Sequence, residues 1–528
     1  MLQVYDLPNT LEYAPGQLEA AGPSAEHPLA PGGDVDILDF LIGGFLSIVV
    51  IGFQIVISPN VFHWMLLPIF VCGVLIGADV SVWLRQKISL FDPKGLIGFA
   101  GFLHFVVAPP LILYYEAEGP EHYMVENWRP LLGTMAVLNM VGLLLYRFFE
   151  AKAYQRPTRS EYFFRALNFQ KTVLRLPYIL VFLVFAYFFF SIRAGGLRGL
   201  ILQERQGEMG GGLTGFGPIM VLRYSLPIVL FIVITIFHGQ REQQRQSYFL
   251  YLFLFAGFAL FHFLTVGIRG SRSATLYGVF WAGCLIHLYW KRIKMKWVLL
   301  SVIPLVLFVY LYAFYKEVGI RFLDIFRGAA SVKSLEYETG RTFGTLLISD
   351  MSRARVQAAM LDVLTKKPWE YRYRLGSTYL TSVVPYIPRK LWPSKPMDSG
   401  KIIAGTELFY GPGSHSPAVY ITFSGGARAT AIYGLAGEAM LNFGVAAVPI
   451  VFAIYGFVVG KIRRRMHSYL SGDIRLLTSP FLAILCVILF THDMTNVVAV
   501  SLFYWFVPAL MIYLISDKRP KVSDEFYG

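Results

Sequence analysis

Long apolar runs separated by short polar connections make up most of the chain. A helix that crosses a membrane needs about 20 mostly apolar residues, and about twelve segments meet this requirement. These segments are 38–57, 62–84, 95–115, 130–149, 174–192, 217–238, 248–266, 273–290, 296–315, 434–460, 477–492 and 494–515. Only His492 and Asp493 separate the last two, so one broken hairpin is an alternative there. The pattern predicts an all-α polytopic membrane protein with about 12 transmembrane helices.

The overall composition agrees with a membrane protein and excludes several other classes. Of the 528 residues, 55% are apolar and 15% are charged, against about 25% charged residues in an ordinary soluble chain. A soluble domain needs more polar surface than this, and a disordered or collagen-like chain has a different composition. The cysteines lie inside separate apolar runs, which predicts core residues and no disulfide framework; they are Cys72, Cys284 and Cys486.

Basic residues follow every even-numbered apolar run. Representative residues of these clusters are Arg85, Arg147, Arg241, Lys291, Lys461 and Lys518. Because Lys and Arg hold short loops on the cytoplasmic side of a membrane, both termini are predicted to be cytoplasmic. The net charge of +14 then reflects membrane topology, and no nucleic-acid partner is expected.

Polar segments divide the chain into five parts. The first part, 1–35, has no Lys or Arg and is rich in proline and acidic residues, so it is predicted to be a disordered cytoplasmic tail and no signal peptide. It leads into Asp34-Val-Asp36, a D-x-D spacing that acidic tails supply by chance. The other parts are transmembrane helices 1–9 (36–315), a large outer loop of short helices and coil (316–433), transmembrane helices 10–12 (434–515) and a cytoplasmic tail (516–528).

Arginines gather in the predicted outer segments, where the orientation rule disfavours them. They are Arg193, Arg198, Arg205, Arg269, Arg272, Arg341, Arg353, Arg355, Arg372, Arg374, Arg389 and Arg428. Solvation explains any single one, but Arg269 and Arg272 occupy a short turn between two apolar runs. Two guanidinium groups near the bilayer are costly unless an anion meets them, and their planar forks fit a phosphate or diphosphate. Arg389 and Arg428 are the next candidates for the same anion.

Acidic residues near the outer face are fewer, and Glu438 is the most informative. It lies in Gly437-Glu-Ala-Met-Leu-Asn-Phe-Gly444, at the start of an apolar run, where an ionisable group is a functional candidate. A salt bridge to Arg428 or another arginine, or a favourable position at a helix start, explains Glu438 equally well. For His492 and Asp493, helix capping is preferred over proton relay.

The remaining polar residues give no sign of a metal or nucleotide site. Three lone histidines in apolar runs are predicted to be core residues; they are His104, His262 and His287. The sequence has no H-E-x-x-H, no P-loop, no G-x-G-x-x-G after a strand and no G-x-S-x-G. ATP-driven transport and nucleotide chemistry are therefore unsupported, and no cofactor is expected.

Four short motifs occur in an order that is typical of one bacterial family. They are Arg193-Ala-Gly-Gly196 in an outer loop, Gly270-Ser-Arg272 at the head of a run, Ile387-Pro-Arg-Lys-Leu-Trp-Pro-Ser-Lys-Pro396 late in the large loop, and Gly437-Glu-Ala-Met-Leu-Asn-Phe-Gly444. Over residues 36–515 the chain resembles the bacterial oligosaccharide repeat-unit polymerases, the Wzy-type O-antigen and exopolysaccharide polymerases.

The resemblance implies a multi-pass glycosyltransferase with a GT-C-like fold in the bacterial inner membrane, its large loop in the periplasm. Such an enzyme joins a glycan on one undecaprenyl diphosphate to a repeat unit on another, without a metal. The expected partners are the lipid-linked oligosaccharides and the bilayer, with a flippase and a chain-length regulator beside them. Arg269, Arg272, Arg389 and Arg428 are expected to bind the diphosphate, and Arg272 is also expected to be catalytic. Glu438 is expected to be the general base. Arg193, Arg198 and Trp392 are expected to bind the sugars or the lipid head.

Two alternatives remain open from the sequence. An O-antigen ligase-type transferase shares the many spans, the large periplasmic loop and the outer arginines, and it would move finished polymer to another acceptor. A transporter for the lipid-linked unit predicts two similar halves with broken helices near the middle of the membrane. No such internal symmetry is found, and a transporter does not need the long 316–433 loop.

Overall fold

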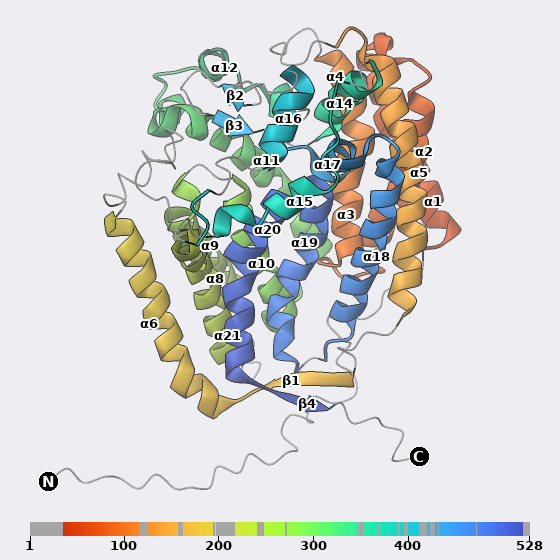
Figure 1. Ribbon diagram of the computed structural model, residues 1–528. Coiled ribbons are helices and arrows are strands. Elements are labelled where there is room, and N and C mark those ends of the chain that lie inside the picture. Colours follow the sequence, from red (N-terminus) through yellow and green to blue (C-terminus); the bar gives the residue numbers. More distant parts are fainter. Residues whose placement is uncertain are drawn as a thin grey trace, which may run out of the picture.

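The computed structural model describes most of the chain as helices (Figure 1). The described residues are 35–115, 125–156, 162–193, 196, 217–239, 248–269, 272–346, 348, 352–366, 370–387, 391–394, 400–410, 420–422, 428–430, 432–470 and 472–520. Among them, eight helical segments are long and apolar enough to cross a membrane: Ile37–Ile57, Leu66–Leu84, Pro93–Tyr114, Trp128–Gln155, Phe169–Ile192, Met295–Tyr315, Ile474–Thr491 and Met494–Ile515. The protein is therefore an all-α protein of multi-pass membrane character.

Every apolar run predicted from the sequence lies mostly in helix. The N-terminal helices are α1 (Ile37–Ile57), α2 (Leu66–Leu84), α3 (Pro93–Phe102), the π-turn η3 (Leu103–Val107), α4 (Ala108–Tyr114), α5 (Trp128–Gln155) and α6 (Phe169–Arg193). The central helices are α8 (Gly217–Gly239), α9 (Tyr248–Thr265), α10 (Arg272–Leu285), the π-turn η6 (Ile286–Trp290) and α11 (Met295–Val318). The C-terminal helices are α18 (Ala447–His467), α19 (Ser479–Thr491), α20 (Met494–Val500), the π-turn η12 (Ser501–Phe506) and α21 (Val507–Ile515).

One predicted span is divided in two. The run 434–460 forms a short helix, α17 (Gly434–Phe443), and then the long helix α18, which begins three residues after Gly444. Gly444 adopts φ +83°, a left-handed conformation that ends helices and favours glycine. Hydrophobic content is continuous across this break, so apolar scanning alone predicts one helix where the chain makes two.

The long loop 316–433 is built mainly from short helices, as predicted. They are the 3-10 helix η7 (Gly319–Ile325), α12 (Val332–Thr339), α13 (Phe343–Thr345), α14 (Ala354–Lys366), α15 (Ser377–Thr381), the 3-10 helix η9 (Val384–Tyr386) and α16 (Gly400–Tyr410). The prediction missed one antiparallel pair of strands, β2 (Tyr420–Thr422) and β3 (Arg428–Thr430), in which Tyr420 faces Thr430. Strands of three residues are too short to show an alternating pattern. These elements crowd one end of the bundle (Figure 1).

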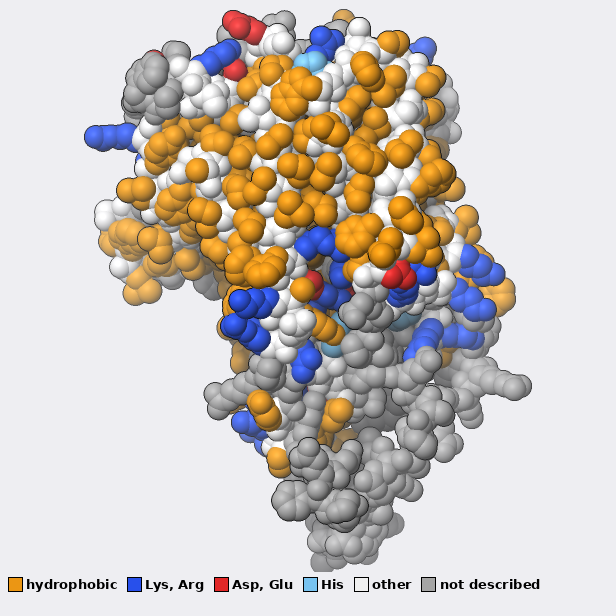
Figure 2. Space-filling model, turned by 90° about the vertical axis from the view of Figure 1, so that its right-hand side faces the viewer, with side chains coloured by type: hydrophobic (Ala, Val, Ile, Leu, Met, Phe, Trp, Pro, Cys, Tyr) orange, Lys and Arg blue, Asp and Glu red, His pale blue; other side chains and the backbone are white. Residues whose placement is uncertain are grey.

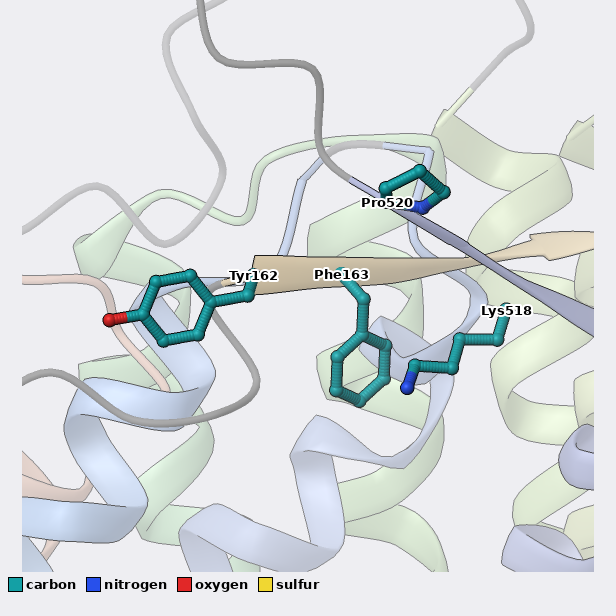
Figure 3. Close-up of a pocket in the computed structure, with 4 residues that line it drawn as sticks. All are labelled: Tyr162, Phe163, Lys518 and Pro520. Atoms are coloured by element: carbon teal, nitrogen blue, oxygen red, sulfur yellow. The ribbon is translucent and has the colours of Figure 1, made fainter.

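The opposite end carries a second pair of strands that the sequence did not predict. β1 (Phe163–Leu167) pairs antiparallel with β4 (Ser516–Pro520), so the residues before α6 lie against those after α21. The Lys518 ammonium lies 4.4 Å from the centre of the Phe163 ring, and both side chains line a shallow open pocket with Tyr162 and Pro520 (Figure 3). Residues 516–520, expected to begin a tail, are therefore part of the folded structure.

Charged residues at this strand-paired end form buried ion pairs. Asp79 lies 3.1 Å from Arg147 and 3.8 Å from Lys94, and Asp92 lies 2.8 Å from Arg463. We call this set the basic-end network; its members are Asp79, Asp92, Lys94, Arg147, Glu150, Arg463 and His467. The basic clusters that follow several different apolar runs thus meet at one end of the molecule.

The surface of the bundle has the polarity that a membrane requires. Figure 2 shows the face on which α1, α2 and α5 lie, with hydrophobic side chains over a broad area and Lys and Arg gathered below it. Near that boundary, Asp36 caps α1 and pairs with Arg85 (3.1 Å) and Lys87 (2.8 Å). The D-x-D spacing therefore has a structural explanation at Asp36, whereas Asp34 lies outside the described residues. The three cysteines are buried thiols, which confirms their prediction as core residues.

Candidate functional site

Glu438 lies at the end of the bundle that carries the large loop, and it is buried, with 3% of its surface exposed. Its Oε1 accepts a hydrogen bond of 2.8 Å from the Thr378 hydroxyl on α15, and its Oε2 accepts one of 2.6 Å from the backbone N–H of Met494. No ion pair of Glu438 occurs among the described residues. The salt bridge considered from the sequence is therefore not seen there, and Glu438 sits in the second turn of α17, past the helix start.

The tight turn between α19 and α20 explains the hydrogen bond from Met494. Asp493 caps α20, since its side chain accepts a hydrogen bond of 3.3 Å from the Asn496 N–H. This confirms capping as the role of Asp493. Met494 is the first residue of α20, and the first N–H groups of a helix have no partner within the helix. The Glu438 carboxyl supplies that partner.

Asn442 fixes the orientation of the Thr378 hydroxyl. Its side-chain N–H group donates to the Thr378 hydroxyl oxygen (2.7 Å) and to the backbone oxygen of Glu438 (2.8 Å). Its side-chain oxygen accepts from the Gly376 N–H (2.9 Å), and Gly376 adopts φ +87° at the start of α15. The Thr378 hydroxyl accepts from Asn442, so its own hydrogen is directed to Glu438.

A buried ion pair lies beside this group. The Lys401 ammonium on α16 is 2.8 Å from Asp493, and both side chains are almost completely buried. We call the five residues Glu438, Thr378, Asn442, Asp493 and Lys401 the Glu438 cluster. Its members come from the loop helices α15 and α16, from α17 and from the α19–α20 turn, which lie close together at the loop end of the bundle (Figure 1).

The surroundings of Glu438 bring its pKa close to neutrality. Burial raises the pKa most, and the nearby Asp493 carboxylate raises it further, to about 7. The Met494 N–H, the Thr378 hydroxyl and the Lys401 charge act in the opposite direction. A carboxyl with a pKa near the working pH can accept a proton in one step and release it afterwards, as a general base must.

A second polar group borders the cluster around Arg353, which precedes α14. The Arg353 backbone N–H donates to His104 Nδ1 (3.1 Å), and its side-chain Nε donates to the Thr491 carbonyl (3.1 Å). His104 is buried and hydrogen-bonded, as predicted for a core histidine. Burial, with the Arg353 and Lys401 charges, lowers the pKa of His492 to about 3, which favours its neutral form.

Arg272 lies on a neighbouring wall of the same region. It begins α10, and the backbone oxygen of Ala274, in the same turn, accepts hydrogen bonds from Tyr504 (3.3 Å) and His262 (3.0 Å). Tyr504 follows Met494, the residue whose N–H donates to Glu438, by ten residues along the last helical segment.

The other predicted site residues are only partly described. Arg269 ends the 3-10 helix η5 (Gly267–Arg269), Arg428 lies on β3 and Arg193 ends α6, but their side chains fall outside the description. Arg389 and Arg198 lie outside the described residues altogether. Trp392 is described and exposed. The structure therefore leaves the grouping of these arginines as a prediction.

Sequence reasoning missed three members of the Glu438 cluster, Thr378, Asn442 and Lys401. Asn442 had a usable signal, because it follows Glu438 by four residues and so lies on the same face of a helix. Thr378 and Lys401 had none, since each comes from the large loop and meets Glu438 or Asp493 only through the tertiary fold. Among the described residues, no group of His, Cys, Asp and Glu could hold a metal ion.

Comparisons with protein-family models, curated proteins and solved structures give no match. The fold alone defines the class: an all-α membrane protein with many apolar helices. The main candidate feature of the site is Glu438, a buried carboxyl with a pKa raised to about 7, at the end of the bundle that carries the large loop.

Proposed function

We propose that the protein is a membrane glycosyltransferase that polymerises undecaprenyl-diphosphate-linked oligosaccharide repeat units at the periplasmic face of the bacterial inner membrane. The observation that supports this best is Glu438, a buried carboxyl with neutral hydrogen-bond donors and a pKa of about 7. A sugar-transfer reaction needs a group of this kind to accept the acceptor hydroxyl proton.

The proposed reaction is a displacement at the anomeric carbon of the donor sugar. The acceptor hydroxyl oxygen forms a bond to that carbon while its proton passes to Glu438. The bond between the anomeric carbon and the diphosphate oxygen breaks, and its electron pair leaves with undecaprenyl diphosphate. The leaving group takes up negative charge, which arginine side chains stabilise in a site with little water.

The proposed diphosphate ligands are Arg272, Arg269, Arg389 and Arg428, with Arg193, Arg198 and Trp392 at the sugars or the lipid head. The planar guanidinium groups of these arginines suit the diphosphate, and the Glu438 carboxyl suits the acceptor hydroxyl.

The proposal includes a topology. With the basic-end network in the cytoplasm, both termini are cytoplasmic, the twelve or so apolar runs cross the membrane and the large loop is periplasmic. Labelling of single cysteines introduced at the exposed positions Tyr337 and Leu391 checks this orientation. Modification of intact cells by a membrane-impermeant thiol reagent is expected at both positions, and protection at both would contradict the topology.

Surface-glycan chain length tests the function. A strain lacking the protein should carry single repeat units on its final acceptor, and Glu438→Gln should reproduce this at normal protein level. Arg272→Ala and Arg272→Lys should both fail, because one ammonium cannot replace the guanidinium fork. The matched control is Glu338→Gln, an exposed glutamate of the same loop, which should leave chain length unchanged.

Two outcomes would reject this assignment. Wild-type chain length in the Glu438→Gln strain would show that Glu438 is not needed for the reaction. Accumulation of finished polymer on the lipid carrier in the deletion strain would indicate a ligase-type transferase.

A further inference from the structure

The loop helix α16 contributes a buried lysine, Lys401, to the Glu438 cluster. Lys401 Nζ lies 2.8 Å from Asp493 Oδ2, with 5% of the lysine side chain and none of the aspartate side chain exposed. A buried charge is costly unless a partner of opposite charge meets it. Lys401 and Asp493 therefore depend on each other, and the pair forms only when α16 of the large loop is docked on the α19–α20 turn.

The α19–α20 turn transmits this pairing to Glu438. Asp493 caps α20, and the next residue, Met494, donates its N–H to Glu438 Oε2. We propose that Lys401 and Asp493 are a positioning pair that holds Glu438 ready to accept a proton, so that docking of α16 completes the general base. This inference rests on the function proposed above for Glu438.

Electrostatics gives the two members of the pair opposite effects. The Asp493 carboxylate raises the pKa of Glu438, and the Lys401 ammonium lowers it. Removal of either charge alone leaves the other uncompensated beside Glu438. A nearby charge shifts a carboxyl pKa by about 1 unit or more.

Several other polar groups near Glu438 are neutral or have partners of their own, so the nearby charges that shift the pKa of Glu438 are those of Lys401 and Asp493. From α15, Tyr379 faces the carboxyl, and burial keeps it protonated by raising its pKa. On the turn, His492 is neutral. At the start of α14, Arg353 is directed to the Thr491 carbonyl. The helix α19 has no charged residue, and those of α18 begin at Lys461, near its far end.

A protonation assay on the full chain tests the pair without requiring polymer synthesis. Dicyclohexylcarbodiimide reacts with buried protonated carboxyls: the acid adds across a C=N bond, and the adduct rearranges to a stable N-acylurea. Mass spectrometry of the purified protein in detergent then gives labelling of Glu438 as a function of pH. The midpoint for wild type is expected near pH 7, with loss of label above it.

Substitutions of the two residues should move this midpoint in opposite directions. Lys401→Met should raise it by about one pH unit, and Asp493→Asn should lower it by about one pH unit. The double variant should return toward wild type, and Lys401→Arg should stay near it because the charge is kept. The control is Lys366→Met, a half-exposed lysine on α14, which should not move the midpoint.

Opposite shifts support the inference; no shift, or shifts in the same direction, overturn it. Either single variant decides alone if the other does not fold, since each has its own predicted sign. Opposite shifts in a protein that makes no polymer would keep the positioning pair and reject the polymerase. Normal polymer synthesis in these variants with unchanged midpoints would keep the polymerase assignment and reject the positioning pair.

Discussion

Two buried acids at opposite ends of the helical bundle, Asp92 and Glu438, have different kinds of partner. At the basic-end network, Asp92 contacts both Arg463 and His467, and Glu150 contacts Arg463. At the loop end, Glu438 contacts a hydroxyl and a backbone N–H. Burial raises the pKa of both Asp92 and Glu438, but Arg463 and His467 bring that of Asp92 well below its ordinary value, whereas that of Glu438 remains raised. Ion pairing stabilises the charged form of Asp92, whereas the surroundings of Glu438 favour its protonated form.

The largest loss of stability is expected from Arg463→Met, which removes the cation that pairs with the buried acids of the basic-end network. This substitution leaves Asp92 and Glu150 buried without their shared partner, at a cost of about 3–5 kcal/mol of unfolding free energy. Thermal unfolding in detergent measures it. Lys461→Met, on the same helix with only one long hydrogen bond, is the control and should change stability little. Equal unfolding temperatures for the two variants would contradict a structural role for the network.

The contributions of Glu438 and Asp92 to the free energy of unfolding should change with pH in opposite directions. The pKa of Glu438 rises from 4.5 to about 7 on folding, so its contribution is present at low pH and lost as pH rises between these values. The expected loss is about 3 kcal/mol. Asp92 behaves oppositely, because its lowered pKa gives stability that disappears as pH falls below about 4.

Unfolding of wild type and Glu438→Gln across pH 4.5 to 8 measures this loss. The decline with rising pH should be smaller in the variant, which has no proton to release. Parallel curves would show that Glu438 does not titrate in this range. Transfer activity of the wild type should rise with pH through about 7, as the ionised base appears.

Truncation of Glu438 should cost less than the loss of Arg463. Glu438→Ala leaves the Met494 N–H and the Thr378 hydroxyl without their acceptor, which costs about 1–3 kcal/mol. Glu438→Gln keeps one acceptor oxygen for the Met494 N–H, so it should be less destabilised than Glu438→Ala while losing polymer synthesis. If Glu438→Gln is as unstable as Glu438→Ala, the carboxyl is needed for folding and its loss of activity says nothing about chemistry.

The smallest effect is expected at an exposed ion pair of the loop. Arg321 lies 3.1 Å from Glu338, and both side chains are exposed. Exposed pairs contribute about 0.2–1 kcal/mol, so Glu338→Gln should barely change the unfolding temperature. A large change would show that this exposed pair contributes more than exposed ion pairs ordinarily do.

Much of the fold could be predicted because membrane helices leave a simple signal. Apolar runs of sufficient length mark α1, α2 and α5 to within a few residues. The break at Gly444 was missed because glycine is common inside membrane helices and apolar content continues across it. The pair of strands β1 and β4 was missed because both strands are short and lie far apart in the chain, and because β4 is polar.

The candidate site could be predicted only one residue at a time. Glu438 stood out because an ionisable side chain in an apolar run is unusual. Its partners Thr378 and Lys401 are ordinary loop residues until the tertiary fold brings them to α17 and the α19–α20 turn. Desolvation, which sets the proton affinity of Glu438, depends on that packing and leaves no trace in residue spacing.

The ribbon of β1 and β4 also has a mechanical consequence. Five residue pairs join the base of α6 to the base of α21, and most residues in the apolar stretch of α6 are not buried against the rest of the bundle. A helix that is held at one end by a strand pair and exposed along most of its length can pivot about the held end. Any tilt of α6 therefore moves its far tip, at Arg193, through the widest arc, while the strand-paired base stays in place.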